Sequence, residues 1–189
     1  MGIGYLFFAF CFFLDIPYGA LKIDLFSDLW AYLLLFAGAV RLTKQEPSFG
    51  KVCKVLYPAI GLEILVYGTQ FAGFLGFSHA TAVLTVLRIC EVPIRILVQA
   101  VVLLALYRLA QGAAAPALAR AVSRTLTVGV VFALCRMATV WIRTLCTSLS
   151  IRALAIAMLG VDLFAFVWIF WCLALLLRFY FGFAARQSL

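Results

Sequence analysis

Charge is scarce in this sequence, and its scarcity excludes a water-soluble fold. Only 12% of the 189 residues are charged and 67% are hydrophobic, which gives a mean hydropathy of +1.18. Soluble domains are roughly half apolar by comparison. A water-soluble fold could not cover this much apolar surface. The sequence therefore predicts an integral membrane protein whose main partner is the lipid bilayer.

Histidine and closely spaced cysteines are also lacking, which removes most kinds of active site. His79 is the one histidine, so no H-E-x-x-H motif and no multi-histidine metal site can form. The six cysteines include no C-x-x-C pair, and cysteine within an apolar run more often packs than reacts. G-x-S-x-G is absent, and Ser78 beside His79 is no catalytic triad. We therefore expect neither enzymatic activity nor a cofactor.

Acidic residues are few: seven stand against fifteen basic ones, which leaves a formal charge of +8. Such an excess would suit nucleic acid if the basic residues formed a solvated patch with stacking aromatics. Most of the Lys and Arg residues lie instead at the ends of apolar runs, where positive charge orients a membrane protein. We expect no nucleic-acid partner.

Apolar runs, by contrast, fill the chain. Crossing a hydrocarbon core of about 30 Å takes about 20 helical residues, so this length suffices for six spans with short loops. The predicted fold is an all-α, single-domain bundle of six transmembrane helices over residues 3–18, 23–42, 55–75, 80–109, 125–148 and 151–179. Span four is expected to kink at Pro93, which cannot donate a backbone hydrogen bond. Spans one and two could instead form a re-entrant hairpin, because the strictly apolar part of span two is short.

Basic residues near the span ends predict the orientation. If both termini face the cytoplasm, nine basic residues near the span ends lie inside: Arg41, Lys44, Lys51, Lys54, Arg108, Arg120, Arg124, Arg178 and Arg186. Three would lie outside: Lys22, Arg143 and Arg152. This bias follows the positive-inside rule. We expect a multi-pass protein of a bacterial cytoplasmic membrane with cytoplasmic N- and C-termini.

Ionisable residues deep in the predicted spans are the strongest functional signal. Each costs at least ~2.5 kcal/mol at a helix centre and persists only when it is paired or hydrated. The set comprises Glu63, Arg88, Glu91, Arg95, Arg136 and Asp162. Arg88, Glu91 and Arg95 share one helix face, and Arg136 is expected to pair with Glu63, Glu91 or Asp162. The sequence predicts an interior polar network, which either fixes helix register or lines a ligand site or ion path.

A second group of carboxylates surrounds the first two spans. Asp15, Asp24 and Asp28 lie with Lys22 near the expected outer mouth. Three carboxylates could attract a cation, but helix capping and interfacial solvation explain them as well. The second interpretation is favoured.

Small residues also recur at helical spacing. Gly61, Gly68, Ala72 and Gly76 share a face of span three, and in lipid such faces pack helices closely. We expect this seam to pack within the chain, with a homo-oligomer or another membrane protein as the alternative.

Two functions remain open. The first is binding or translocation of a small anionic or zwitterionic solute at the interior polar site, because the fork of an arginine grips carboxylate or phosphate at two points. The second is a non-catalytic accessory or regulatory subunit of a membrane complex, in which the polar network is purely structural.

Overall fold

A computed structural model describes residues 2–13, 17–18, 21–22, 28–77, 79–145 and 151–187. The side chains of the two strands, of Thr81 and Asp162, and of residues 139–145, 151–158 and 184–187 fall outside that description.

The described chain is almost wholly helical. Its helices are α1 (Ile3–Phe12), α2 (Asp28–Leu42), α3 (Phe49–Phe74), α4 (Ala80–Gly112), α5 (Pro116–Leu145) and α6 (Ile151–Gln187). Two short strands, β1 (Pro17–Tyr18) and β2 (Leu21–Lys22), pair antiparallel between α1 and α2.

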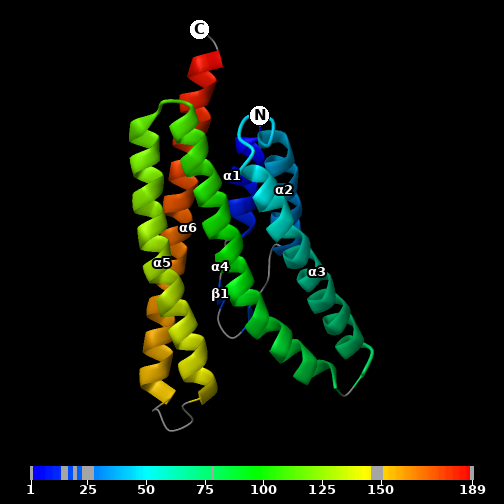
Figure 1. The fold of residues 1–189 in the computed structure, drawn as a ribbon. Coiled ribbons are helices and arrows are strands. Elements are labelled where there is room, and N and C mark those ends of the chain that lie inside the picture. The colour runs from blue at the N-terminus through cyan, green and yellow to red at the C-terminus, as the bar shows by residue number, and fades with distance from the viewer. Residues whose placement is uncertain are drawn as a thin grey trace.

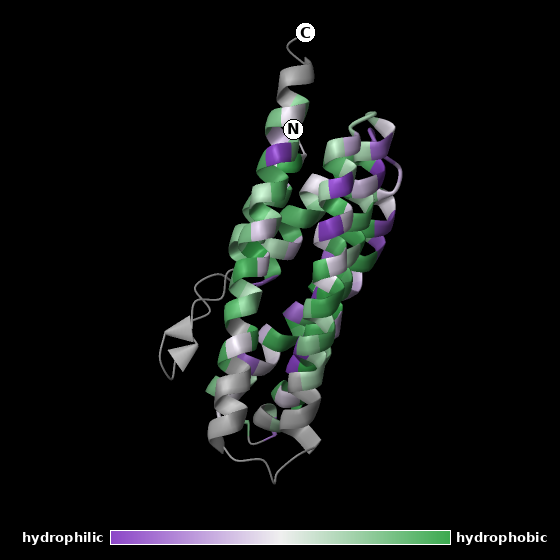
Figure 2. Cartoon of the chain, turned by 90° about the vertical axis from the view of Figure 1, so that its left-hand side faces the viewer, coloured by the Kyte–Doolittle hydropathy of each residue, from purple (hydrophilic) through white to green (hydrophobic). Residues whose placement is uncertain are grey.

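Three helices are long and apolar enough to cross a membrane, and they indicate a membrane location. The apolar segments are Ala82–Gly112 in α4, Pro116–Ala138 in α5 and Leu159–Phe183 in α6. Figure 2 shows hydrophobic residues along most of the helix length, with hydrophilic residues more frequent toward the end marked by N and C. The helix α1 is apolar but has only 10 residues.

Several helix ends differ from the ends of the predicted spans. The first helix ends at Phe12, and residues 17–18 form β1 instead of completing a span. The helix α3 already begins at Phe49 and α5 at Pro116, so both helices start before the predicted spans, which begin at residues 55 and 125. Proline suits the first turn of α5 because the backbone N–H that it lacks would have no helical partner there. Hydropathy does not include these first turns in the spans, because they carry basic residues.

The six helices form a closed ring. Each helix packs against its neighbours in sequence, and α1 also packs against α6. Within the described residues no other pair of helices comes into backbone contact. Figure 1 shows α5 and α6 on the left, α3 on the right, and the marks of both termini at the same end of the molecule. Side chains from non-adjacent helices can therefore meet only in the interior of the ring.

Glycines allow close contacts between helices at two places. A Cβ on Gly38 would lie 3.0 Å from the Gly2 carbonyl oxygen, so α2 approaches α1 closely there. A Cβ on Gly129 would lie 2.5 Å from the ring of Trp168, so α5 and α6 meet at that point. Close van der Waals packing of this kind holds helices together in lipid, because the hydrophobic effect does not drive helices together there.

The predicted glycine seam of α3 does not pack against the part of the chain that the structure describes. A Cβ on Gly61 or on Gly68 would have nothing within 4 Å. Both glycines are exposed. Periodic spacing alone could not show which face of α3 turns toward α2 and α4.

The turns between helices are locally stabilised. Gly76 ends α3 at a φ of 89°, and the Phe77 amide donates to the Ala72 carbonyl at 3.2 Å, as in a Schellman ending. In the turn before α3, the Ser48 hydroxyl and amide donate to the Glu46 carboxylate at 2.6 and 3.2 Å. These hydrogen bonds lower the pKa of Glu46.

The helix α4 continues through Pro93 without ending. Figure 1 shows that its ribbon changes direction between its two ends. A proline within a helix is a common cause of such a bend.

Candidate interior ligand site

Three carboxylates from three different helices meet inside the ring. Asp28 opens α2, Glu63 lies in the middle of α3, and Glu91 lies in α4. One carboxylate oxygen from each lies within 4.8 Å of the others. Asp28 and Glu63 are only 5% and 3% exposed, and Glu91 is half-buried. We call these three residues the acidic cluster.

Arg95 joins the acidic cluster from α4, one helical turn beyond Glu91. Its guanidinium donates to Asp28 Oδ2 in a buried ion pair. The same guanidinium lies 5.2 Å from the centre of the Phe13 ring, which adds a cation–π contact. Because α2 and α4 share no backbone contact, this ion pair connects them across the interior of the ring.

Tyr32 adds a polar atom beside the cluster. It lies four residues after Asp28, on the same face of α2, and its ring packs edge-on against Phe13 at 5.4 Å. The side chain is fully buried, and its hydroxyl has no hydrogen-bond partner among the described residues. This hydroxyl interacts electrostatically with four charged side chains: Arg95, Asp28, Glu63 and Glu91.

Within the acidic cluster and Arg95, negative charge exceeds positive charge when every carboxylate is ionised. Three carboxylates within 4.8 Å of one another carry a formal charge of −3 when ionised, and Arg95 supplies +1. Arg88 acts on Glu91 from one turn further along α4, but its side chain is exposed. Ionised carboxylates this close together repel one another, so the site favours a positively charged species.

The sequence predicted part of this arrangement. Glu63, Glu91 and Arg95 come together as an interior network, whereas the side chain of Arg88 lies outside it. Arg136 is half-buried on α5, 6.0 Å from the Phe132 ring, and its expected carboxylate partner stays a prediction. The side chain of Asp162 lies outside the described residues.

The residue that the sequence misplaced is Asp28. It was grouped with Asp15 and Asp24 at an outer mouth, but it is buried and pairs with Arg95. Asp15 and Asp24 lie outside the described residues. Tyr32 was not predicted at all, although its spacing of four residues from Asp28 is visible in the sequence.

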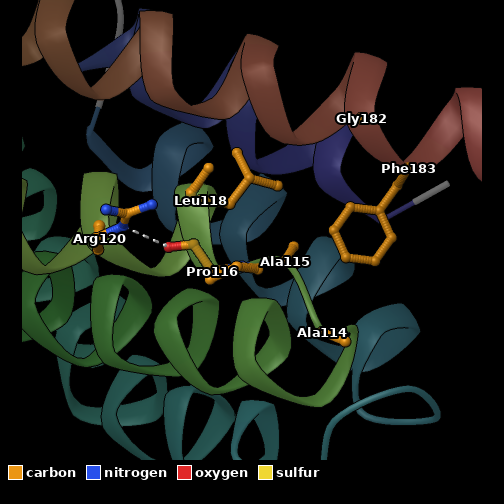
Figure 3. A pocket seen from close by; sticks show the side chains of 8 residues that line it. Ala114, Ala115, Pro116, Leu118, Arg120, Gly182 and Phe183 are labelled. Carbon is orange, nitrogen blue, oxygen red and sulfur yellow. Dashed lines mark hydrogen bonds between the residues drawn. The ribbon is translucent and has the colours of Figure 1, made fainter.

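A separate cavity of about 310 Å³ lies at the end of the ring near the α4–α5 turn. Figure 3 shows Pro116, Leu118, Arg120 and Phe183 around it, with Gly182 of α6 opposite the turn. The Arg120 Nε donates to the Pro116 carbonyl at 3.4 Å. Apolar side chains make up most of its lining, so it offers little to hold a polar solute.

Comparison with protein-family models, with curated proteins and with solved structures finds no match for this chain. The fold and the site therefore define its class by themselves: a helical protein with three membrane-spanning candidates and a buried acidic site.

Proposed function

We propose that this protein is a multi-pass membrane protein that binds or translocates a small solute carrying a positive group, cationic or zwitterionic, at the acidic cluster. One observation carries the proposal: three carboxylates from α2, α3 and α4 lie within 4.8 Å of one another. Ionisable residues inside a membrane protein commonly mark substrate or ion pathways.

The charge balance refines the expected ligand. Arginine alone would favour an anionic solute, but Arg95 is already bonded to Asp28. A purely anionic ligand would add negative charge to a site that has a surplus of it. A zwitterion remains compatible because its positive group could meet the carboxylates.

The proposed topology has six spans with both termini in the cytoplasm of a bacterial cell. The basic residues at the span ends support this orientation. At about 1.5 Å per residue, α1 and α2 are about 15 and about 22 Å long, so these two elements need the chain between them to complete a crossing of about 30 Å.

A ligand panel tests the proposed function. The purified chain is heated with inorganic cations, organic amines, zwitterionic amino acids or carboxylate anions, and unfolding is followed by tryptophan fluorescence. Cationic or zwitterionic members should raise the melting temperature, because a ligand at 100 times its Kd stabilises the bound state by about 2.7 kcal/mol. Stabilisation by anions alone would contradict the proposal.

The accessory-subunit alternative rests on the buried Asp28–Arg95 pair, which joins α2 to α4. In that function the pair only fixes how the two helices are aligned. If no ligand on the panel changes the melting temperature of the folded chain, and Glu63→Gln leaves that temperature unchanged or lower, the accessory-subunit function is favoured instead.

A further inference from the structure

We propose that the acidic cluster of Asp28, Glu63 and Glu91 binds one divalent metal cation of the hard, oxygen-preferring kind, with Ca²⁺ as the best fit in size. The inference rests on the function proposed above, because it identifies the positive group that this site accepts.

The spacing of the carboxylates suits a single ion. Three atoms that lie within 4.8 Å of one another always have a common point no more than about 2.8 Å from each. Calcium–oxygen distances are about 2.3–2.6 Å, so a small inward shift of the side chains completes the coordination. Magnesium, at about 2.0–2.1 Å, would require a larger contraction and near-ideal octahedral geometry.

The donor set suits the same class of ion. The three groups are carboxylates, and hard cations prefer carboxylate, carbonyl and water oxygens. Neither histidine nor cysteine belongs to the cluster, so nothing in it selects for zinc or copper. Waters would complete the coordination shell.

The charges suit a divalent ion. With all three carboxylates ionised, the cluster and Arg95 together carry a formal charge of −2, which one divalent cation neutralises. Arg88 also interacts electrostatically with Glu91. It lies one turn away on the same helix, α4, and its side chain is exposed. Arg95 holds Asp28 Oδ2, so one end of this carboxylate is fixed in place.

Two buried polar atoms indicate a ligand, and one of them, the Tyr32 hydroxyl, lies outside the three carboxylates. Asp28 Oδ1 and the Tyr32 hydroxyl have no hydrogen-bond partner among the described residues, and their residues are 5% and 0% exposed. Leaving such atoms unsatisfied costs about 1–3 kcal/mol each. Asp28 Oδ1 could bind the cation directly, and the Tyr32 hydroxyl could accept a hydrogen bond from a water on the ion.

The test is metal binding by the full-length chain in lipid nanodiscs. After treatment with a chelator and removal of the chelator, the protein is titrated with Ca²⁺ and with Mg²⁺ in a calorimeter. We expect one Ca²⁺ per chain and weaker binding of Mg²⁺. Glu63→Gln and Glu91→Gln should each weaken Ca²⁺ binding by at least about tenfold. Mutation of a residue that only supports a metal ligand already lowers metal affinity by about that factor.

Glu46→Gln is the matched control, because it removes the same charge at the α2–α3 turn, away from the cluster, and it should bind Ca²⁺ as the wild type does. The wild-type stoichiometry decides the question if one variant fails to fold. Absence of divalent-ion binding by the wild type would overturn the metal site, as would equal binding by all variants.

The ligand panel and the calorimetric titration can contradict the proposed function and the metal site independently of each other. Binding of an amine or a zwitterion without any divalent ion would leave the proposed function standing and remove the metal. Proton uptake by the cluster without ion binding would also overturn the inference. Tighter binding of Mg²⁺ than of Ca²⁺ would contradict the assignment of size.

Discussion

Asp28 and Arg95 are the two residues on which the interior site depends most directly. They come from helices that share no backbone contact, and their ion pair is buried, with side chains 7% and 11% exposed. Breaking a buried pair by removing one partner typically costs about 3–5 kcal/mol, because a charge is left behind. Removing both partners leaves no such charge.

A double-mutant cycle tests this dependence. Arg95→Gln should lower the free energy of unfolding by about 3 kcal/mol or more, and Asp28→Asn combined with it should recover part of the loss. The measurement is denaturant or thermal unfolding of the purified variants. Arg108→Gln is the control, since Arg108 is an exposed arginine on the same helix. Additive effects of the two changes would mean that the pair does not couple α2 to α4.

Most of the interior site was visible at the residue scale. Glu63, Glu91 and Arg95 stand alone within apolar runs, and the cost of burying charge in lipid makes such residues conspicuous. Asp28 was not conspicuous, because it lies where the polar and apolar parts of the second span meet. Hydropathy gives no depth at such a boundary, and only tertiary packing brings Asp28 to Arg95.

At the scale of helices, contact between α5 and α6 depends on a missing side chain. Gly129 faces Trp168, whose ring also stacks on Phe132 at 6.2 Å. Gly129→Ala would place a Cβ 2.5 and 2.7 Å from two ring atoms, so the indole or the helix must move. Overpacking of this kind typically costs about 1–3 kcal/mol, which should appear as a lower melting temperature.

Gly68→Ala is the matched control for this prediction. A Cβ at Gly68 meets nothing within 4 Å, and alanine favours a helix over glycine by about 0.8–1.0 kcal/mol in water. The α3 variant should be as stable as the wild type or more so. Equal effects at the two glycines would show that α5 and α6 do not pack as described.

The helices themselves were predictable from the sequence, but their ends were not. Long apolar runs predict α4, α5 and α6 because lipid requires every backbone group to bond within its own helix. The turns at 49–54 and 116–124 are helical yet carry basic residues, so hydropathy left them outside the predicted spans.

At the scale of the whole molecule, the ring closes through α1 and α6, and the marks of both termini lie at the same end of it (Figure 1). The six-span proposal predicts that reporter fusions after Lys54 and after Gln187 both report a cytoplasmic location.

It also predicts that a cysteine in place of Ala20, in a chain free of other cysteines, reacts with a membrane-impermeant maleimide from outside the cell. No labelling of residue 20 in intact cells, with labelling after lysis, would indicate a re-entrant hairpin.

The central claim is that the acidic cluster carries a surplus of negative charge that its positive ligand relieves. Glu91→Gln tests it most directly, by thermal unfolding at pH 8.5 with and without a chelator. Carboxylates less than 5 Å apart repel by a few kcal/mol at an effective dielectric constant of about 20. In the chelated state the variant should therefore melt several degrees above the wild type, whereas Glu46→Gln should not. A Glu91→Gln chain that melts below the wild type would show a balanced structural network and contradict the account.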